Sequence, residues 1–373
     1  MAMNLRNQKW LRRIGSGIIA ALSFLYLAAC LIPFLDPGTF WFIAALGLVF
    51  PVLALLMLLI VIYMAVRRSR LFFLAVIIFM AGWQQLAVMV GFNFFANQKG
   101  AGANADFSVL TWNVNRWDEQ NRKLKGGVSF RELMLDAINS QQADILCFQE
   151  FFEPYGNGLG EFQSNIRALA AMGYPYAVFF PSSVIYTGER KFGLFICSRY
   201  PITDSGMYRF ANTPHSEGVM YADIRVKEQV VRVFNVGLES FRGSEDGVDG
   251  IEHAGGLKKT KHIFTGLKRS YSHRAEQARQ VSRLLKESPY PVILAGKLAD
   301  VPNSYTYFKV RNGMKDVFLE RGSGLGSTLD VFPPVFRMDY ILSDKRFRIL
   351  RYQRPVWGYS DHRPIIAEFS LNK

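Results

Sequence analysis

Acidic, amide and histidine side chains follow short apolar segments at several points of this sequence. Asn113 comes directly after the apolar stretch 107–112, and Glu150 closes the segment Asp144-Ile145-Leu146-Cys147-Phe148-Gln149-Glu150. An acid directly after a buried strand is aimed at the rim of its sheet, where a hard cation such as Mg²⁺ finds oxygen ligands. Both positions are therefore candidate metal ligands, although solvated strand ends are the ordinary alternative.

A second group of chemically capable residues lies near the C-terminus. Asp339 stands in an apolar strand-like segment, and Asp361 directly precedes His362 in Ser360-Asp361-His362-Arg363-Pro364. A buried Asp fixes one tautomer of a histidine, and a second acid beside that histidine completes a set suited to phosphoryl chemistry. Each motif alone also fits a capped turn or a surface ion pair.

The elements that must position these residues alternate as strands and helices after residue 106. We expect helices at 130–140, 161–172 and 271–286, and strands at 107–112, 144–148, 177–180, 193–198, 219–226, 230–236, 291–295, 338–342, 347–353 and 364–369. Strands from distant parts of the chain outnumber helices, which predicts an α/β fold of two packed sheets flanked by helices. The Gly-rich, charged segment 241–262 is expected to be a long loop, either a partner-binding element or a disordered insertion.

Three apolar runs at 14–35, 40–66 and 71–95 contain no Lys, Arg, Asp or Glu. Each can cross a hydrocarbon core of about 30 Å, which takes roughly 20 helical residues. A cleaved signal peptide followed by two core helices fits less well, because the apolar region of a signal peptide is shorter. We therefore expect the first 95 residues to form a membrane anchor of three transmembrane helices. Gln84 and Gln85 need partners there, either in a neighbouring helix or in another membrane protein.

Basic residues flank these runs asymmetrically. The connection around Asp36 carries none, whereas the connection 67–70 holds three arginines and the N-terminus holds Arg6, Lys9, Arg12 and Arg13. Positive residues stay on the cytoplasmic side, so both the N-terminus and the connection 67–70 are expected inside. The small polar segment 96–106 is expected to be a linker to an external domain, 107–373, which is periplasmic if the chain sits in a bacterial cytoplasmic (inner) membrane.

Charge and cysteine content limit the partners. The first 70 residues hold seven Lys and Arg and one Asp, which leaves +8 of the net charge of +14 on the rest of the chain. Because these charges are dispersed, nucleic acid is not expected as a partner. The lipid bilayer and anionic headgroups are expected partners.

Cys147 and Cys197 fall in apolar strands, where a buried thiol is the default and a single disulfide between them stays an alternative.

The motifs and their order together resemble the endonuclease/exonuclease/phosphatase superfamily over residues 107–371. The matching segments are Leu110-Thr111-Trp112-Asn113, 144–150, 193–202, 232–240, 274–278, Met338-Asp339-Tyr340-Ile341 and 360–364, together with the segment 294–304. The resemblance implies a four-layer α/β sandwich of two mixed sheets with outer helices. It also implies an Mg²⁺-dependent or Mn²⁺-dependent phosphoesterase, unless the site is damaged.

Five positions keep the residue that the resemblance implies. Asn113 and Glu150 match the metal-site amide and the principal metal-ligand glutamate. Asp361 matches the acid before the catalytic histidine. His362 matches that histidine, and Asp339 the acid that orients it.

Three other positions depart from the family pattern. Gly237 stands where the family has a phosphate-contacting His, Lys297 where it has the Asp that aligns the attacking water, and Ala299 where it has an Asn. Replacing a carboxylate by an ammonium roughly 6 Å from a divalent cation changes the Coulomb energy by on the order of 10 kcal/mol at an effective dielectric near 20. Asp300 could supply the lost acid after a register shift, but 301–304 keeps the family register.

The sequence therefore predicts a membrane-anchored, catalytically inactive protein of phosphoesterase fold. It would act as a scaffold or bind an anionic ligand or another membrane or periplasmic protein. Its cleft would bind ligand through Lys297, His362 and Asn113, with no cofactor or only weakly bound Mg²⁺ at Asn113, Glu150 and Asp361. The alternative is a phosphodiesterase of weak or altered activity that uses Mg²⁺ or Mn²⁺ on lipid headgroups, nucleic acid or sugar phosphates.

Overall fold

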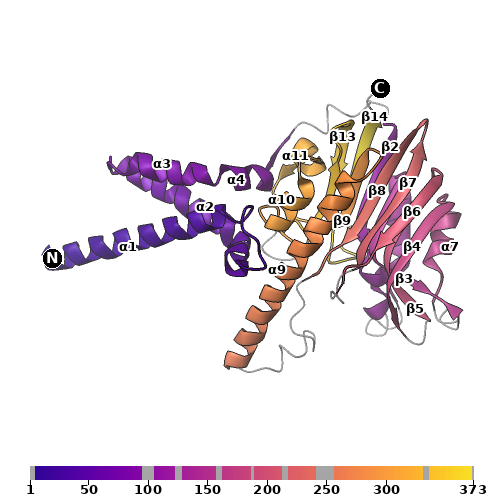
Figure 1. Ribbon diagram of the computed structural model, residues 1–373, viewed down its shortest axis with the longest axis horizontal. Coiled ribbons are helices and arrows are strands. Elements are labelled where there is room, and N and C mark those ends of the chain that lie inside the picture. The colour runs from indigo at the N-terminus through magenta and orange to yellow at the C-terminus, as the bar shows by residue number, and fades with distance from the viewer. Residues whose placement is uncertain are drawn as a thin grey trace.

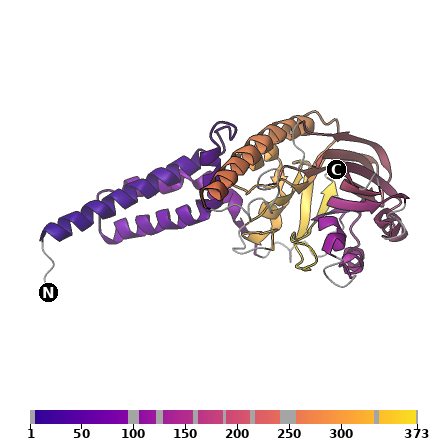
Figure 2. The same cartoon turned by 90° about the horizontal axis from the view of Figure 1, so that it is seen from below.

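The computed structural model describes residues 5–94, 105–121, 128–156, 162–185, 189–211, 217–240, 256–330 and 336–371. Two six-stranded mixed sheets pack face to face in the domain that follows the N-terminal helices (Figure 1). This arrangement confirms the predicted α/β sandwich. The N-terminal helices extend away from the sandwich, with the N-terminus at the far end (Figure 2).

The first sheet has the strand order β13-β14-β2-β3-β5-β4. Its strands are β2 (Phe107–Asn113), β3 (Ile145–Pro154), β4 (Tyr176–Ile185), β5 (Arg190–Ser198), β13 (Phe347–Gln353) and β14 (Ile365–Leu371). β2 and β3 are parallel, and their register pairs Asn113 with Gln149. The carboxyl ends of these two strands therefore meet at one edge of the sheet.

The second sheet has the order β10-β12-β9-β8-β7-β6. Its strands are β6 (Ile202–Tyr208), β7 (Gly218–Val226), β8 (Gln229–Gly237), β9 (Val292–Lys297), β10 (Lys315–Asp316) and β12 (Asp339–Ser343). β8 and β9 are parallel, and the other pairs are antiparallel. The sequence did not predict β6 or the two-residue β10.

Three apolar layers hold the sandwich together. The layer between the sheets includes Val109, Ile196, Val233 and Ile341. The outer face of the first sheet is covered by η1 (Asn115–Asn121), α6 (Arg131–Gln141) and α7 (Asn165–Ala171), and that of the second by α9 (Gly256–Lys286) and α10 (Tyr305–Arg311). A short helix, α11 (Val317–Arg321), completes the domain. The two sheets and the helices over each outer face are the four layers predicted from the resemblance.

The two strand cysteines are buried free thiols on opposite faces of the first sheet. Cys147 packs in the layer between the sheets, and Cys197 packs in the layer under α6 and α7. Successive side chains of a strand point to opposite faces, so neighbours in adjacent strands with opposite orientation cannot bond. The alternative of a disulfide is therefore wrong.

The apolar N-terminal region forms α1 (Leu5–Cys30), α2 (Trp41–Val66), α3 (Phe72–Ala81) and α4 (Trp83–Met89). Two of these helices are long and apolar enough to cross a membrane, and α3 with α4 makes a third if the bent pair is one span. The third predicted helix, 71–95, is thus not continuous: it bends by 54° and is followed by β1 (Gly91–Phe92). β1 pairs with β11 (Ser323–Gly324) of the domain.

The bend in the third apolar run has a local cause. The Tyr26 hydroxyl donates a hydrogen bond of 2.8 Å to the carbonyl of Phe79, at the end of α3. A Cβ atom on Gly82 would lie 2.0 Å from this hydroxyl, so only glycine fits at the break. Gln85 is buried and donates to the Cys30 carbonyl at 2.6 Å, which is the helix–helix contact expected for it.

The structure corrects several predicted boundaries and leaves parts of two predicted segments outside the described residues. The long loop predicted at 241–262 is wrong from residue 256 onward, where α9 begins; residues 241–255 lie outside the described part of the chain. Phe264 and Leu267 in this added length of α9 are spaced for one helix face, and Phe264 packs edge-on against Trp41 of α2. The strand predicted to end at Phe148 continues to Pro154. The predicted linker 96–106 lies outside the described residues as far as 104.

Candidate functional site

The register of the second sheet brings the substituted positions together at one edge. Gly237 at the end of β8 pairs with Lys297 at the end of β9, and Lys297 pairs with Asp339 at the start of β12. On the other side, Gly237 pairs with Gly218, the first residue of β7. β9 is therefore held by two neighbours, which place Lys297 between Gly237 and Asp339.

Glu150 lies in a β-bulge where the pairing of β3 and β5 shifts between Phe148 and Phe151. Its φ of 50° is in the left-handed region, which costs a residue with a Cβ about 1–3 kcal/mol and is common at functional sites. The bulge turns its carboxylate toward the ends of β2 and β9. There Oε1 accepts hydrogen bonds from Lys297 Nζ at 2.8 Å and from Asn113 Nδ2 at 2.9 Å.

Lys297 forms a buried ion pair with Glu150; the side chains are 8% and 17% exposed. Burial would raise the pKa of Glu150, but the ammonium, followed by the Asn113 amide, holds it well below its usual range. Burial likewise disfavours the ammonium, yet the carboxylates of Glu150 and Glu217 outweigh it and raise the pKa of Lys297. Both groups are therefore charged at neutral pH, and their charges cancel within the site.

Glu217 is a member of the site that sequence reasoning missed. It directly precedes β7, and its Oε1 accepts a hydrogen bond of 2.7 Å from the backbone N–H of Glu150. A Cβ atom on Gly237 would lie 2.6 Å from Glu217 Oε2, so this carboxylate occupies the space that a side chain at 237 would need. Burial raises the pKa of Glu217 to about 7. The Lys297 ammonium opposes this increase, and repulsion from the Glu150 carboxylate adds to it.

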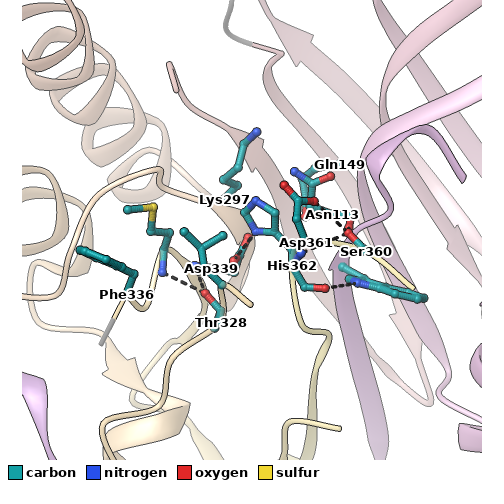
Figure 3. Close-up of polar contacts among 12 residues, drawn as sticks. Asn113, Gln149, Lys297, Thr328, Phe336, Asp339, Ser360, Asp361 and His362 are labelled. Carbon is teal, nitrogen blue, oxygen red and sulfur yellow. Dashed lines mark hydrogen bonds and ion pairs between the residues drawn. The ribbon is translucent and has the colours of Figure 1, made fainter. Parts of the chain in front are cut away.

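The second group of residues predicted from the sequence forms an intact pair. His362 Nδ1 lies 2.7 Å from Asp339 Oδ2, and both side chains are buried. Burial alone would lower the pKa of His362, but the Asp339 carboxylate raises it above its usual value. Figure 3 shows the imidazole ring between Asp339 and Lys297. The predicted orienting role of Asp339 thus has the geometry that it requires.

Backbone contacts hold the loop of His362 against the end of β2. Trp112 Nε1 donates to the His362 carbonyl at 2.8 Å, and the Ser360 hydroxyl donates to the Asn113 carbonyl at 2.8 Å (Figure 3). On the other side, the Thr328 hydroxyl accepts from the backbone N–H of Asp339 at 3.1 Å. The positions of Asn113 and His362 are thereby coupled through the main chain.

The remaining predicted residues, Asp361, Asp300 and Ala299, line a cleft that Lys297 and His362 also line. Asp361 is exposed at its edge, with Ser360 Oγ 3.2 Å from its Oδ1. Asp300 does not substitute for the lost acid, because its Oδ2 accepts from Thr306 Oγ1 at 2.9 Å and faces Arg274 Nε at 3.4 Å. Ala299 has a φ of 54°, a left-handed conformation that Asn tolerates better than Ala.

A buried amide network joins the two sheets beneath the site and was also missed from the sequence. Gln149 Nε2 donates to Asn235 Oδ1 at 2.7 Å and to Thr111 Oγ1 at 3.0 Å. Asn235 Nδ2 in turn donates to the carbonyls of Phe148 and Phe195. Bonds of this kind between buried amides are costly to break, so they fix β3 against β8 directly under Glu150.

The cleft above these residues has a volume of about 590 Å³. It is lined by the charged or ionisable side chains of Glu150, Lys297, His362, Asp361 and Arg274 and by the apolar side chains of Leu48, Leu267, Leu329, Phe336 and Met338. Leu48 belongs to α2, so a helix of the N-terminal region forms part of the wall. The cleft therefore lies between the domain and this helix.

The residues present do not fit the divalent cation that the family resemblance implies. The carboxylate oxygen that would bind the metal is bonded to an ammonium, and a cation beside Lys297 would meet its full positive charge. Among the described residues, no group of three or more His, Cys, Asp or Glu side chains is arranged to hold a metal ion. Lys297 Nζ thus neutralises the Glu150 carboxylate without a metal ion.

Comparison with known proteins supports the same fold. Residues 110–362 match the Endonuclease/Exonuclease/phosphatase family, and residues 12–89 match a domain of unknown function. No curated protein sequence matches the chain.

Three similar structures illustrate the fold. An endonuclease/exonuclease/phosphatase from Bacteroides vulgatus is 16% identical over 71% of this chain and 99% of its own, with a TM-score of 0.49. The human Nocturnin catalytic domain with bound sulfate is 16% identical over 71% and 94%, with a TM-score of 0.48. The mannosyl-6-phosphatase of Bacteroides thetaiotaomicron is 15% identical over 71% and 100%, with a TM-score of 0.46.

Proposed function

Because the chain belongs to the endonuclease/exonuclease/phosphatase family, we propose that it is a membrane-anchored, non-hydrolytic member whose cleft binds an anionic ligand. A scaffolding role toward another membrane or periplasmic protein is part of the same proposal. The observation that carries it is the 2.8 Å ion pair between Lys297 Nζ and Glu150 Oε1. Lys297, Gly237 and Ala299 stand where the family pattern has the water-aligning acid, the phosphate-contacting histidine and the amide.

The magnitude of these losses supports the absence of efficient turnover. Removing a general base typically lowers the rate 10²–10⁴-fold, and removing one donor that stabilises developing charge lowers it by about 10²–10³-fold. The retained Asp339–His362 pair can donate a proton from the ring, but no described carboxylate takes the place of Lys297 beside it. The cofactor that we propose is accordingly none, or Mg²⁺ bound only weakly.

The charges of the cleft support a ligand with a phosphate or carboxylate group. Lys297 lines the cleft as an ammonium with three donors, of which one is directed to Glu150. His362 lines it as well, and the Asp339 carboxylate outweighs the lowering effect of burial and raises the pKa of the imidazole. Phosphate oxygens accept charge-assisted hydrogen bonds from such groups. The Asn113 side chain lies beside Lys297, because both donate a hydrogen bond to Glu150 Oε1.

The proposed location is a bacterial cytoplasmic membrane with the domain on the outer, periplasmic side. Arg279 of α9 binds Asp36, in the connection between α1 and α2, with Nη1 and Oδ2 2.7 Å apart. The domain is therefore next to the connection without basic residues, opposite Arg67, Arg68 and Arg70. Since basic connections stay in the cytoplasm, this contact supports an external domain, with α3 and α4 returning the chain across the membrane.

A hydrolysis assay tests the proposal. The full-length protein in a non-ionic detergent is incubated with Mg²⁺ or Mn²⁺ and a chromogenic phosphodiester, a phospholipid panel, single-stranded DNA and a sugar phosphate. We expect no turnover above that of the His362→Ala variant. Metal-dependent turnover that disappears in His362→Ala and Glu150→Gln overturns the proposal in favour of an active phosphodiesterase.

Restoring the family pattern gives an independent test with a binding readout. The reversion Gly237→His, Lys297→Asp and Ala299→Asn is compared with the same three changes plus Glu217→Ala, because Glu217 fills the space needed at 237. We expect Mn²⁺ binding by calorimetry only in the four-fold variant. The matched control is the four-fold variant with Lys297→Met in place of Lys297→Asp, which removes the ammonium without adding a carboxylate and should not bind. Equal Mn²⁺ binding by the unmodified protein would contradict the reasoning.

A further inference from the structure

A proline in α2 leaves a backbone carbonyl free for the domain. Pro51 has no N–H, so it cannot donate to the carbonyl of Gly47, four residues earlier. Asn303 Nδ2, from the segment that follows β9, donates to this carbonyl at 3.1 Å. A Cβ atom on Gly47 would lie in ordinary van der Waals contact with this segment, 3.5 Å from Asn303 Nδ2 and 3.6 Å from Val301, so the segment packs closely on α2. The segment that carries Lys297 and Ala299 is thus docked on the membrane helix.

The depth of this contact follows from the length of α2. A hydrocarbon core of about 30 Å takes roughly 20 helical residues. Counted back from Val66, the end of α2 next to the basic connection, about 20 residues reach Gly47. Asn303 therefore contacts α2 in its domain-side part, within seven residues of Trp41, and Leu48 is the next residue along the helix.

Other contacts hold the domain in this position. Arg337 Nη2 donates to the carbonyl of Val88 in α4 at 2.8 Å, and Asn93 Nδ2 donates to that of Leu319 at 2.7 Å. Arg337 is buried and also bonds Asp316 Oδ2 at 2.6 Å. Figures 1 and 2 show α9 running from the sandwich toward the membrane helices. The cleft is therefore kept against the membrane surface and is not free to turn away on a flexible tether.

The cleft combines charged and apolar side chains, as an amphiphilic ligand requires. Its apolar lining includes Leu48 of α2, Leu267 of α9 and Phe336. Its charged floor holds Lys297 and His362; Figure 3 shows Phe336 on one side of this pair and Asn113 on the other. A soluble phosphate compound would use only the floor. A lipid entering from the adjacent leaflet would place its phosphate at the floor and its acyl chain along the apolar lining.

We propose that the ligand of the cleft is a membrane phospholipid, whose phosphate-bearing headgroup binds at Lys297 and His362 while its acyl chain stays against Leu48 of α2. This inference rests on the proposed function and specifies its ligand. The membrane helices thereby contribute a wall of the binding site in addition to anchoring the domain.

Photocrosslinking of the full-length protein in phosphatidylcholine nanodiscs tests this proposal. The probes are phosphatidylglycerol with a diazirine in one acyl chain and a diacylglycerol with the same diazirine and no phosphate. We expect saturable labelling of cleft residues by the phosphatidylglycerol probe, at least ten-fold above the diacylglycerol probe. Leu48→Trp, which fills the cleft, should lower this labelling about ten-fold. The matched control Val52→Trp, one turn further along α2 at an exposed position, should leave it unchanged.

Three other outcomes overturn the proposal. Equal labelling by both probes means that no phosphate is recognised, and equal effects of Leu48→Trp and Val52→Trp mean that the lipid does not enter the cleft. Competition by glycerol phosphate as effective as that by unlabelled phosphatidylglycerol identifies a soluble phosphate compound as the ligand. Hydrolysis of the bound phospholipid in the presence of Mg²⁺ would instead contradict the proposed absence of catalysis and leave the ligand class standing.

Discussion

Replacing Lys297 by Met tests the assigned role of the ammonium most directly. The methionine side chain fills most of the space of the lysine stem but leaves the carboxylate of Glu150 with only the Asn113 amide, 2.9 Å away. Breaking a buried ion pair by removing one partner typically costs 3–5 kcal/mol, because an uncompensated charge stays buried. Lys297 and Glu150 are both largely buried, so we expect Lys297→Met to destabilise the protein by about 3–5 kcal/mol at pH 8.

The loss should depend on pH in a defined direction. In the unmodified protein the lowered pKa of Glu150 means that the pair contributes fully above about pH 4.3, its unfolded value, and is lost as the pH falls through the folded pKa. The raised pKa of Lys297 means that the contribution persists until the pH rises through that value. Without the ammonium, burial raises the pKa of Glu150, which can then protonate. The cost of Lys297→Met is therefore smaller at pH 5 than at pH 8.

Thermal unfolding of the full-length chain in detergent, followed by near-ultraviolet circular dichroism, measures this difference. A loss of 3–5 kcal/mol corresponds to a Tm lower by roughly 6–20 °C for a domain of this size. The surface variant Lys309→Met is the control and should change stability by less than about 0.5 kcal/mol. The double variant Glu150→Gln, Lys297→Met should recover much of the loss. Lys297→Met within about 0.5 kcal/mol of the unmodified protein at both pH values would refute the buried-pair reasoning.

Three further predictions concern neighbouring residues. Ala299→Gly should stabilise the protein by about 0.5–1 kcal/mol in urea titrations, because glycine adopts the φ of 54° without strain; a loss of stability would contradict this. The raised pKa of Glu217, about 7, means that the folded state binds its proton more tightly, so stability should fall as pH rises from about 4.5 through 7. Glu217→Gln should flatten that fall, and an unchanged pH profile would count against the assignment. Asp339→Asn should lower the pKa of His362 in an NMR titration and cost more stability at pH 6 than at pH 9, since the raised pKa contributes only below it; an unshifted His362 resonance would rule this out.

Much of the fold could be predicted from the sequence because alternation and apolar runs are local signals. The parallel pair β2 and β3 and the pair of Asp339 and His362 follow from strands with motifs at their ends. The start of α9 was missed because glycines and charges in residues 256–262 obscured its helical period. That added length of helix also packs against α2, through Phe264, and no local pattern encodes such a contact.

The sequence predicted those residues of the candidate site that belong to a motif. It did not predict Glu217, which occupies the space that a side chain at position 237 would need. Lys297 could be identified as a substitution, but its bond to Glu150 depends on the bulge that reverses φ at 150. Glu217 belongs to no motif and reaches the site only through the pairing of Gly218 with Gly237. A small residue where a family has a large one indicates that another side chain occupies the space, and this signal could have led to a search for Glu217.

The carboxylate of Glu217 beside Gly237 has an evolutionary consequence. A histidine introduced at 237 would collide with it, and an aspartate introduced at 297 would add a third carboxylate to Glu150 and Glu217 with no cation between them. Both of these steps toward the family pattern are therefore unfavourable while Glu217 is present, and its removal makes them tolerable. We therefore expect that any route to His at 237 and Asp at 297 passes first through the replacement of Glu217.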